Sequence, residues 1–282
     1  VFRLGDFVNS NYKQFFEKVE EGGFSVGAIS PMNASNNLVN PTYFIPDPWT
    51  ETYPDKSFFS KAIHSAVSQA VNDNSQSKLT ISSIISLALS FIFLVNPKKY
   101  LPMIFYAVSS IRKPWKRALF LDLLLHEIHV TLFKRKKTEF STVFFNAGAH
   151  IQHHYFFNSK FVQNLKLQNP SWYINKNDDP FLDMLITYNK MLKEILEIDG
   201  TEVIISTGLS QNPFDYLKFY YRLKDHQKFL SELNISFKKV TPRMTRDFLI
   251  TCNSSDEAKI CEEKLKKITL PDGKKLFEEI DN

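Results

Sequence analysis

The sequence predicts an α/β fold in which a mainly parallel sheet is flanked by helices and interrupted by a helical insertion. A helix that ends in two glycines and leads into an apolar strand, residues 11–29, is half of a βαβ unit. An amphipathic helix followed by a β-branched run, residues 181–206, indicates a second unit of this kind. Residues 56–137 carry only helical signals, which is typical of an insertion or cap.

The first predicted helix spans residues 11–21, with Phe15, Phe16 and Val19 at helical spacing and Gly22-Gly23 as its stop. The apolar run 24–29 follows as a buried strand. From residue 31 to residue 53 the chain is rich in Pro and Asn. Because proline removes backbone freedom, we expect a structured loop there.

The helical region contains one long apolar segment, Leu79 to Val95, which is just short of the length that a membrane-spanning helix needs. We expect a buried or cap helix; a lipid-touching surface is the alternative, and peripheral membrane contact through 79–95 stays open. Further on, His126 and His129 share one helix face. Their spacing misses the i,i+4 histidine pair of zinc proteases, so packing at a helix boundary is the simpler interpretation.

The remaining elements alternate between strands and helices. Strands are predicted at 142–145, 202–206 and 248–251, and helices at 181–197, 225–233 and 255–267. The predicted domains are therefore an α/β core, 1–55 and 138–282, and the helical insertion, 56–137.

The net charge of +5 is spread along the chain apart from Lys134 to Lys137, which argues against a dedicated nucleic-acid surface and leaves an anionic substrate compatible. Two cysteines, Cys252 and Cys261, fit a reducing compartment better than a disulfide framework. A cytoplasmic location is therefore expected.

The segment Phe145 to Tyr155 carries three of the seven histidines within five residues, at the end of an apolar strand. If it begins a helix, His150, His153 and His154 share one face. Clustered imidazoles ligate zinc or another divalent metal, act as acid and base, or donate hydrogen bonds to phosphate or sulfate. The alternative is that one or two of them only satisfy buried hydrogen bonds.

The run from Asn146 to His150 resembles the Asp-x-x-x-His metal segment of the alkaline phosphatase superfamily, notably its type I phosphodiesterase and nucleotide pyrophosphatase branch. The entry at 15–29 with the Pro-rich loop up to Trp49 is similar to the segment after the nucleophile in that branch. The strand 203–206 resembles the one that ends in Ser-Asp-His-Gly there. The resemblance implies an alkaline phosphatase-like sheet and metal ligation by Asn146 and His150.

The chain also departs from that pattern. Asn146 stands where the family has Asp, and a neutral amide is a weaker ligand for a dication. Thr207-Gly208 stands where the family has Asp-His, so the second metal site loses both ligands. The family's first Asp and its Ser or Thr nucleophile would have to precede Val1, or the protein lacks them.

Other candidates lie in loops. Asp47 and Glu51, on either side of Trp49, suit acid-base work or substrate contact, although acidic loop residues also form turns. Tyr155 and Trp49 are suited to stacking on a sugar.

Two arginines, Arg243 and Arg246, precede the strand at 248–251, and their guanidinium forks recognise phosphate or sulfate oxygens. Pairing of Arg246 with Asp247 is the structural alternative. Gln211, near the end of the strand at 202–206, offers an amide to a pocket wall.

Two functions fit best. The first is an alkaline phosphatase-like hydrolase or transferase acting on a phosphate ester or phosphodiester, in nucleotide-sugar or glycan metabolism, with His153, His154 and Asp47 as catalytic candidates. The second is a catalytically silent relative that binds a glycan or a protein partner. A third keeps the histidines as acid and base on a sugar without a metal.

Overall fold

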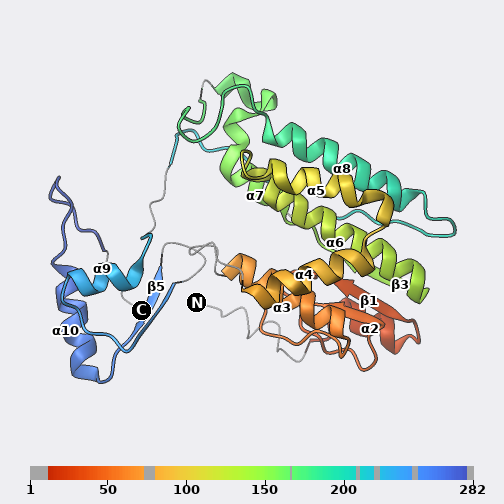
Figure 1. Cartoon of the computed structure of the whole chain (residues 1–282), viewed down its shortest axis with the longest axis horizontal. Helices are drawn as coiled ribbons and strands as arrows, with labels where there is room; N and C mark the ends of the chain where they lie inside the picture. Colours follow the sequence, from red (N-terminus) through yellow and green to blue (C-terminus); the bar gives the residue numbers. More distant parts are fainter. Residues whose placement is uncertain are drawn as a thin grey trace. The chain divides into compact units, whose positions relative to one another are not determined.

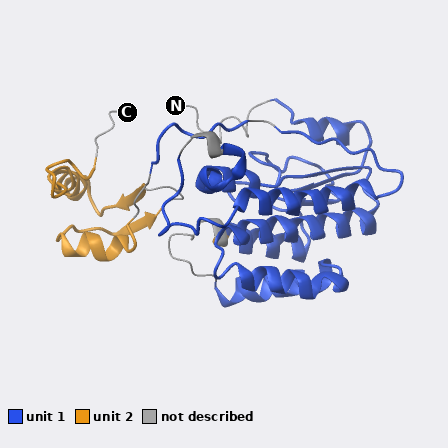
Figure 2. Cartoon of the chain, turned by 90° about the horizontal axis from the view of Figure 1, so that it is seen from above, with its two compact units in different colours: residues 1–68, 80–218 blue, residues 69–79, 219–282 orange. Residues whose placement is uncertain are grey.

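A three-stranded parallel sheet forms the centre of the larger of two units of this computed structural model, which describes residues 12–72, 80–165, 167–207, 210–218, 223–242 and 247–277. The larger unit comprises residues 1–68 and 80–218, and the smaller one residues 69–79 and 219–282 (Figure 2). The α/β class predicted from the sequence is confirmed at this level. The division predicted from the sequence, 1–55 with 138–282 against 56–137, differs from these units and stays a prediction.

The sheet has the order β2-β1-β3, and β1 (Val26–Ile29) is completely buried between its two neighbours. Gly27 of β1 stands in register with Tyr43 of β2 (Tyr43–Ile45) and with Ser141 of β3 (Phe140–Val143). β1 lies within the predicted strand, and β3 starts two residues earlier than predicted. The expectation of a loop throughout 31–53 was wrong at β2, where three apolar residues pair with β1.

One face of the sheet carries a polar chain that explains Gly27. The ring of Tyr43 crosses over β1, so that a Cβ on Gly27 would meet its Cζ at 2.2 Å. The Tyr43 hydroxyl lies 2.6 Å from Ser141 Oγ, and His129 Nε2 lies 2.8 Å from the same oxygen. A tyrosine from one edge strand thus reaches the other only because the central strand has no side chain there.

Helix α6 (Trp115–Lys136) is the element that most others contact. It packs against β1, β3, α4, α5, α7 and α8 (Figure 1). The apolar core between three of these helices is formed by Trp115, Leu119, Ile151, Tyr155 and Met184. The other helices of the larger unit are α2 (Phe15–Glu21), α3 (Phe58–Asn72), α4 (Ile81–Leu94), α5 (Tyr100–Ser109), α7 (Ala147–Tyr155) and α8 (Pro180–Leu196), with 3₁₀ turns η1 (Pro97–Lys99), η2 (Phe156–Asn158) and η3 (Lys160–Leu165).

No single helix in the described ranges is long and apolar enough to cross a membrane. Among the described helices, α4 taken together with η1 and α5 passes such a test by length and composition, and this pair is bent by 119°. The predicted segment 79–95 is therefore helical over Ile81–Leu94, with Thr80 as its N-cap.

The smaller unit pairs β4 (Lys239–Pro242) with β5 (Phe248–Thr251) in an antiparallel hairpin. Helices α9 (His226–Glu232) and α10 (Ser255–Lys266) accompany it. Its core contains Leu230, Ile235, Val240 and Cys261. The predicted strand at 248–251 is confirmed, as is the helix from Ser255, and both cysteines are free thiols.

The predicted strand at 202–206 was wrong. These residues form neither strand nor helix, and Ile204 is 84% exposed. A β-branched run has strand propensity, but a strand also needs a neighbour whose backbone groups it can pair with. No described strand extends the β2-β1-β3 sheet beyond these three members, so the expected second β-to-α unit is absent there.

Candidate functional site

The strands of the parallel sheet all end at one edge, here called the carboxyl edge, which lies beyond Ile29, Ile45 and Val143. Backbone hydrogen bonds keep the exits side by side: Ser30 donates to the Ile45 carbonyl at 2.7 Å, and Phe144 to the Ile29 carbonyl at 3.1 Å. Ligands of parallel α/β sheets bind at such an edge.

Helix α7 begins directly beyond the end of β3, with Asn146 as its N-cap. A buried side chain of α6 holds this start. The carboxylate of Asp122 accepts from the backbone N–H of Ala147 at 2.9 Å and of Asn146 at 3.3 Å. The Tyr188 hydroxyl donates to Asp122 at 2.7 Å and accepts from the Gly148 N–H at 2.8 Å. The first N–H groups of α7 are therefore already used within the protein.

Asp122 is a titratable group in an unusual environment. Burial raises its pKa to about 7, although the Tyr188 hydroxyl and the two backbone N–H groups oppose the rise. The positive end of the α7 dipole also favours the carboxylate. Desolvation favours the protonated form of Asp122, and its hydrogen bonds favour the carboxylate; the two effects are close in size near neutral pH.

The three histidines lie on α7 as the spacing predicted, since residues 147–155 are helical. The rings of His150 and His154 are 4.6 Å apart, and His153 is exposed. Burial lowers the pKa of His150 to about 4, and the charges of His154 and His153 lower it further. His154 is also exposed, but the partial desolvation of its ring lowers its pKa, and its Nδ1 lies 2.8 Å from the Tyr173 hydroxyl. Both rings are neutral at pH 7, the form that binds metals or accepts a proton.

Metal ligation by Asn146 and His150 stays a prediction. The Asn146 side chain is half-buried at the N-cap, and His150 follows one helical turn later. Within the described ranges, however, these histidines join no set of three His, Cys, Asp or Glu ligand atoms close enough to share one ion. A metal at α7 would need further ligands from residues outside the described ranges or from the substrate.

The loop after β2 places the other predicted acid. Asp47 is fully buried, and its carboxylate accepts hydrogen bonds from Asn33 N (2.5 Å), Trp49 N (2.8 Å) and Thr50 N and Oγ1 (2.7 and 2.9 Å). These bonds hold together the segments that follow β1 and β2. Asp47 therefore has the turn-forming role that was the alternative to acid-base catalysis. Catalysis by Asp47 remains a prediction.

The flanking candidates of that loop differ in exposure. Trp49 is half-buried and Glu51 is exposed. His64 of α3 is a neighbour that sequence reasoning missed. Burial lowers its pKa, while its hydrogen bond to the Asp47 backbone and the charge of Asp47 oppose the shift.

The remaining candidates are Tyr155, Gln211, Arg243 and Arg246. Tyr155 lies in α7 itself, but its ring is buried in the helical core, stacked on Tyr173 at 5.6 Å. Gln211 is half-buried in a segment without regular structure. Arg243 and Arg246 lie outside the described residues.

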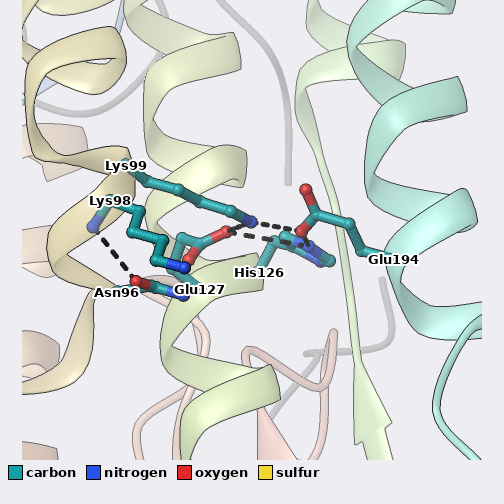
Figure 3. Close-up of polar contacts among 6 residues, drawn as sticks. All are labelled: Asn96, Lys98, Lys99, His126, Glu127 and Glu194. Atoms are coloured by element: carbon teal, nitrogen blue, oxygen red, sulfur yellow. Dashed lines mark hydrogen bonds and ion pairs between the residues drawn. The ribbon is translucent and has the colours of Figure 1, made fainter.

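A second polar cluster, also missed from the sequence, connects η1, α6 and α8 (Figure 3). The Lys99 ammonium forms ion pairs with Glu127 and Glu194, and His126 Nε2 lies 2.8 Å from a Glu194 oxygen. Burial alone lowers the pKa of Lys99, but the two carboxylates outweigh it and raise the pKa. Burial lowers the pKa of His126, so its ring is neutral and the cluster carries a net charge of −1.

This cluster contains donors that suit a divalent metal, because ligand atoms of His126, Glu127 and Glu194 lie within 4.8 Å of one another. Imidazole and carboxylate are ordinary ligands of zinc and manganese. The Lys99 ammonium, however, already neutralises part of the carboxylate charge. The cluster is therefore a salt-bridged link between helices. The side chains of His126 and His129 are buried in the middle of α6 rather than packed at a helix boundary.

Beyond the C-terminal end of α7 lies a cavity of about 400 Å³. Its lining combines amides, charged groups and one aromatic ring: Phe157, Asn158, Ser159, Lys160, Leu167, Gln168, Lys176, Asn177, Asp178 and Asp179. Asn158 Oδ1 is buried without a hydrogen-bond partner, although its Nδ2 donates to the Asn175 carbonyl at 3.3 Å. Near this cavity in sequence, Trp172 is 69% exposed.

Comparison with known proteins adds no relative. The chain matches no protein-family model, no curated protein and no solved structure. The likeness to the alkaline phosphatase superfamily therefore depends on the motifs quoted above.

Proposed function

We propose that the chain belongs to an enzyme that hydrolyses or transfers a phosphate ester or phosphodiester at the carboxyl edge, with His150 and His154 of α7 in its site. The observation that carries the proposal is the pair of facing, neutral imidazoles at the first helix beyond β3. The net charge of +5 suits an anionic substrate.

The chemistry follows from the protonation states. A neutral imidazole takes a proton from an attacking hydroxyl or water, or ligates a divalent metal. The contact between His154 Nδ1 and the Tyr173 hydroxyl orients the imidazole ring. The other ring nitrogen, Nε2, therefore faces away from Tyr173. Zinc or another divalent ion at His150 would supply charge to the phosphate oxygens.

The test is hydrolysis of 4-nitrophenyl phosphate and bis(4-nitrophenyl) phosphate by the full chain, with zinc or manganese added. We expect turnover that falls at least 100-fold in His150→Ala and His154→Ala. Gln152→Ala, on the same helix, is the matched control and should retain activity. Turnover that is undetectable in the parent, or equal in all four proteins, would overturn the proposal.

A second candidate function, glycan binding without catalysis, is favoured by the cavity beyond α7. Asn158 lines this cavity and its buried Oδ1 lacks a partner, so a small movement of the side chain would present an acceptor to a sugar hydroxyl; the amide and carboxylate groups around it offer more. Aromatic rings such as Phe157 stack on sugar faces. Saturation-transfer NMR with hexoses and hexose phosphates, compared between the parent and Asn158→Ala, tests it; a signal that does not change with Asn158→Ala excludes this site.

A further inference from the structure

Helices α4 and α5 expose their apolar sides. On α4 the exposed apolar residues recur at helical spacing, and Ile81 is 78% exposed. On α5 the pattern repeats, with Phe105 67% exposed. The two stripes, here called the α4–α5 surface, contain Ile81, Ile84, Ile85, Ile92, Phe93, Leu101, Ile104, Phe105, Val108 and Ile111.

The polarity of α4 is inverted relative to an ordinary surface helix. A helix on a soluble domain buries its apolar stripe and exposes polar side chains. In α4 the serines Ser83 and Ser90 are buried instead, and Ser90 Oγ donates to the Ser86 carbonyl at 2.8 Å. Since α4 and α5 both pack against α6 (Figure 1), the exposed stripes cover the side of this pair that faces away from α6. An apolar patch of this extent marks a docking surface.

The charged residues within the α4–α5 stretch itself have one sign, although Lys99 pairs with Glu127 and Glu194 and Lys113 pairs with Asp178. Residues 80–121 contain six Lys and Arg and no Asp or Glu. Lys98 is exposed at the bend between the helices, and Arg112 is exposed directly after α5. The basic run 134–137 at the end of α6 is close to α4, because Arg135 Nη1 donates to the Phe93 carbonyl at 3.0 Å.

We propose that the α4–α5 surface docks onto an anionic lipid bilayer, with both helices lying in the interface. An apolar face combined with lysine and arginine at its margins is the pattern of interfacial helices, whose basic side chains reach anionic headgroups. With 14 residues, α4 is only about 21 Å long, shorter than the roughly 30 Å hydrocarbon layer. The bend of 119° keeps α5 from continuing α4 across the layer. This proposal is independent of the function proposed for α7.

A bilayer suits this surface better than a protein partner. Protein interfaces have a polar, solvent-accessible rim around an apolar core that is depleted in charged residues. Here the exposed side chains at the bend and after α5, Lys98 and Arg112, are basic, and the stripe itself has no charged residue across Ile81–Leu94. Lipid is therefore the proposed occupant of this surface, and a second copy of the chain is the alternative.

The test is co-sedimentation of the full chain with vesicles of phosphatidylcholine alone and of phosphatidylcholine with 30% phosphatidylglycerol (roughly physiological charge density). We expect binding to the anionic vesicles that weakens with added salt and falls at least tenfold in the double variant Ile85→Asn, Phe105→Asn. Arg112→Glu should weaken binding severalfold. Ile204→Asn, which changes an exposed isoleucine outside this surface, is the control and should bind as the parent does.

A second measurement tests the proposal independently in case the double variant folds poorly. In Phe105→Trp, which keeps the apolar side chain, tryptophan emission should shift to the blue and be quenched by brominated lipid only with anionic vesicles. Equal sedimentation of the parent and the double variant would overturn the proposal. So would a parent that binds no vesicle but forms a dimer which the double variant dissociates, since the surface would then bind a second copy.

Discussion

The carboxyl group of Asp122 allows a quantitative test of how α7 is held. In the folded chain the pKa of this buried group is about 7, whereas the ordinary value is 3.8. The difference, 7 − 3.8 = 3.2 pH units, corresponds to roughly 4 kcal/mol at about 1.36 kcal/mol per unit. Because the folded state holds the proton more tightly, this group stabilises the fold fully below pH 3.8 and loses that contribution as pH rises through 7.

The perturbation is Asp122→Asn, which keeps the shape and removes the titration. The amide oxygen can still accept from Ala147 N and Tyr188 Oη, while its nitrogen faces the longer contact to Asn146 N. At low pH the variant should be less stable by about 1 kcal/mol for that lost acceptor. From pH 5 to pH 7 the parent alone should lose about 2.5 kcal/mol, so the stability of the variant relative to the parent should rise by about that amount.

The assay is urea unfolding at pH 5, 6, 7 and 8, followed by tryptophan fluorescence. All three tryptophans, Trp49, Trp115 and Trp172, belong to the larger unit, so the signal reports that unit alone. Other titrating groups cancel in the difference between parent and variant. Asp199→Asn, which changes an exposed carboxyl, is the control and should follow the parent at every pH.

A stability difference that stays constant from pH 5 to pH 8 would refute this reasoning. It would mean that the Tyr188 hydroxyl, the two N–H groups and the dipole of α7 keep Asp122 ionised despite its burial. The hydrogen bonds would then outweigh the desolvation.

Two further variants test the polar links elsewhere. Lys99→Met leaves Glu127 and Glu194 without their ammonium partner and should lower the free energy of unfolding by about 2 kcal/mol. Zinc should recover stability in this variant but not in Lys98→Met, and a thermal shift assay with and without zinc measures both. Gly27→Ala should lower the free energy of unfolding, measured in urea, by about 2 to 3 kcal/mol because the new Cβ would clash with the Tyr43 ring. In a Tyr43→Ala background the same substitution should cost almost nothing, and an unchanged cost there would contradict the contact.

The elements that were predictable from the sequence are those with strong local signals. The strand of Phe248–Thr251 and the helix from Ser255 are bounded by breakers and caps that act within a few residues. β2 was missed because three apolar residues between prolines have little local signal. It forms a strand only because β1 offers a partner. The run at 202–206 shows the converse, since strong propensity without a partner produced no strand.

The same distinction applies to the candidate site. His150 and His154 were found because spacing along one helix is a local property. Glu194 and Lys99 were missed because their partners lie tens of residues away in sequence. A usable signal existed in α6, where Asp122, His126 and His129 interrupt a run of leucines and isoleucines on one face. Polar groups in an otherwise apolar face are buried, and buried polar groups need partners.

Those polar groups of α6 also explain why its position is well defined. At positions i, i+4 and i+7 of one face, Asp122 binds the start of α7, His126 contacts Glu194 of α8, and His129 contacts Ser141 of β3. Apolar packing tolerates small rotations of a helix, whereas directional hydrogen bonds to three separate elements do not. A rotation of α6 that broke one of these contacts would strain the others. The start of α7, and with it the His150 and His154 pair, is therefore held in place relative to the carboxyl edge by the same helix that also contacts α4 and α5.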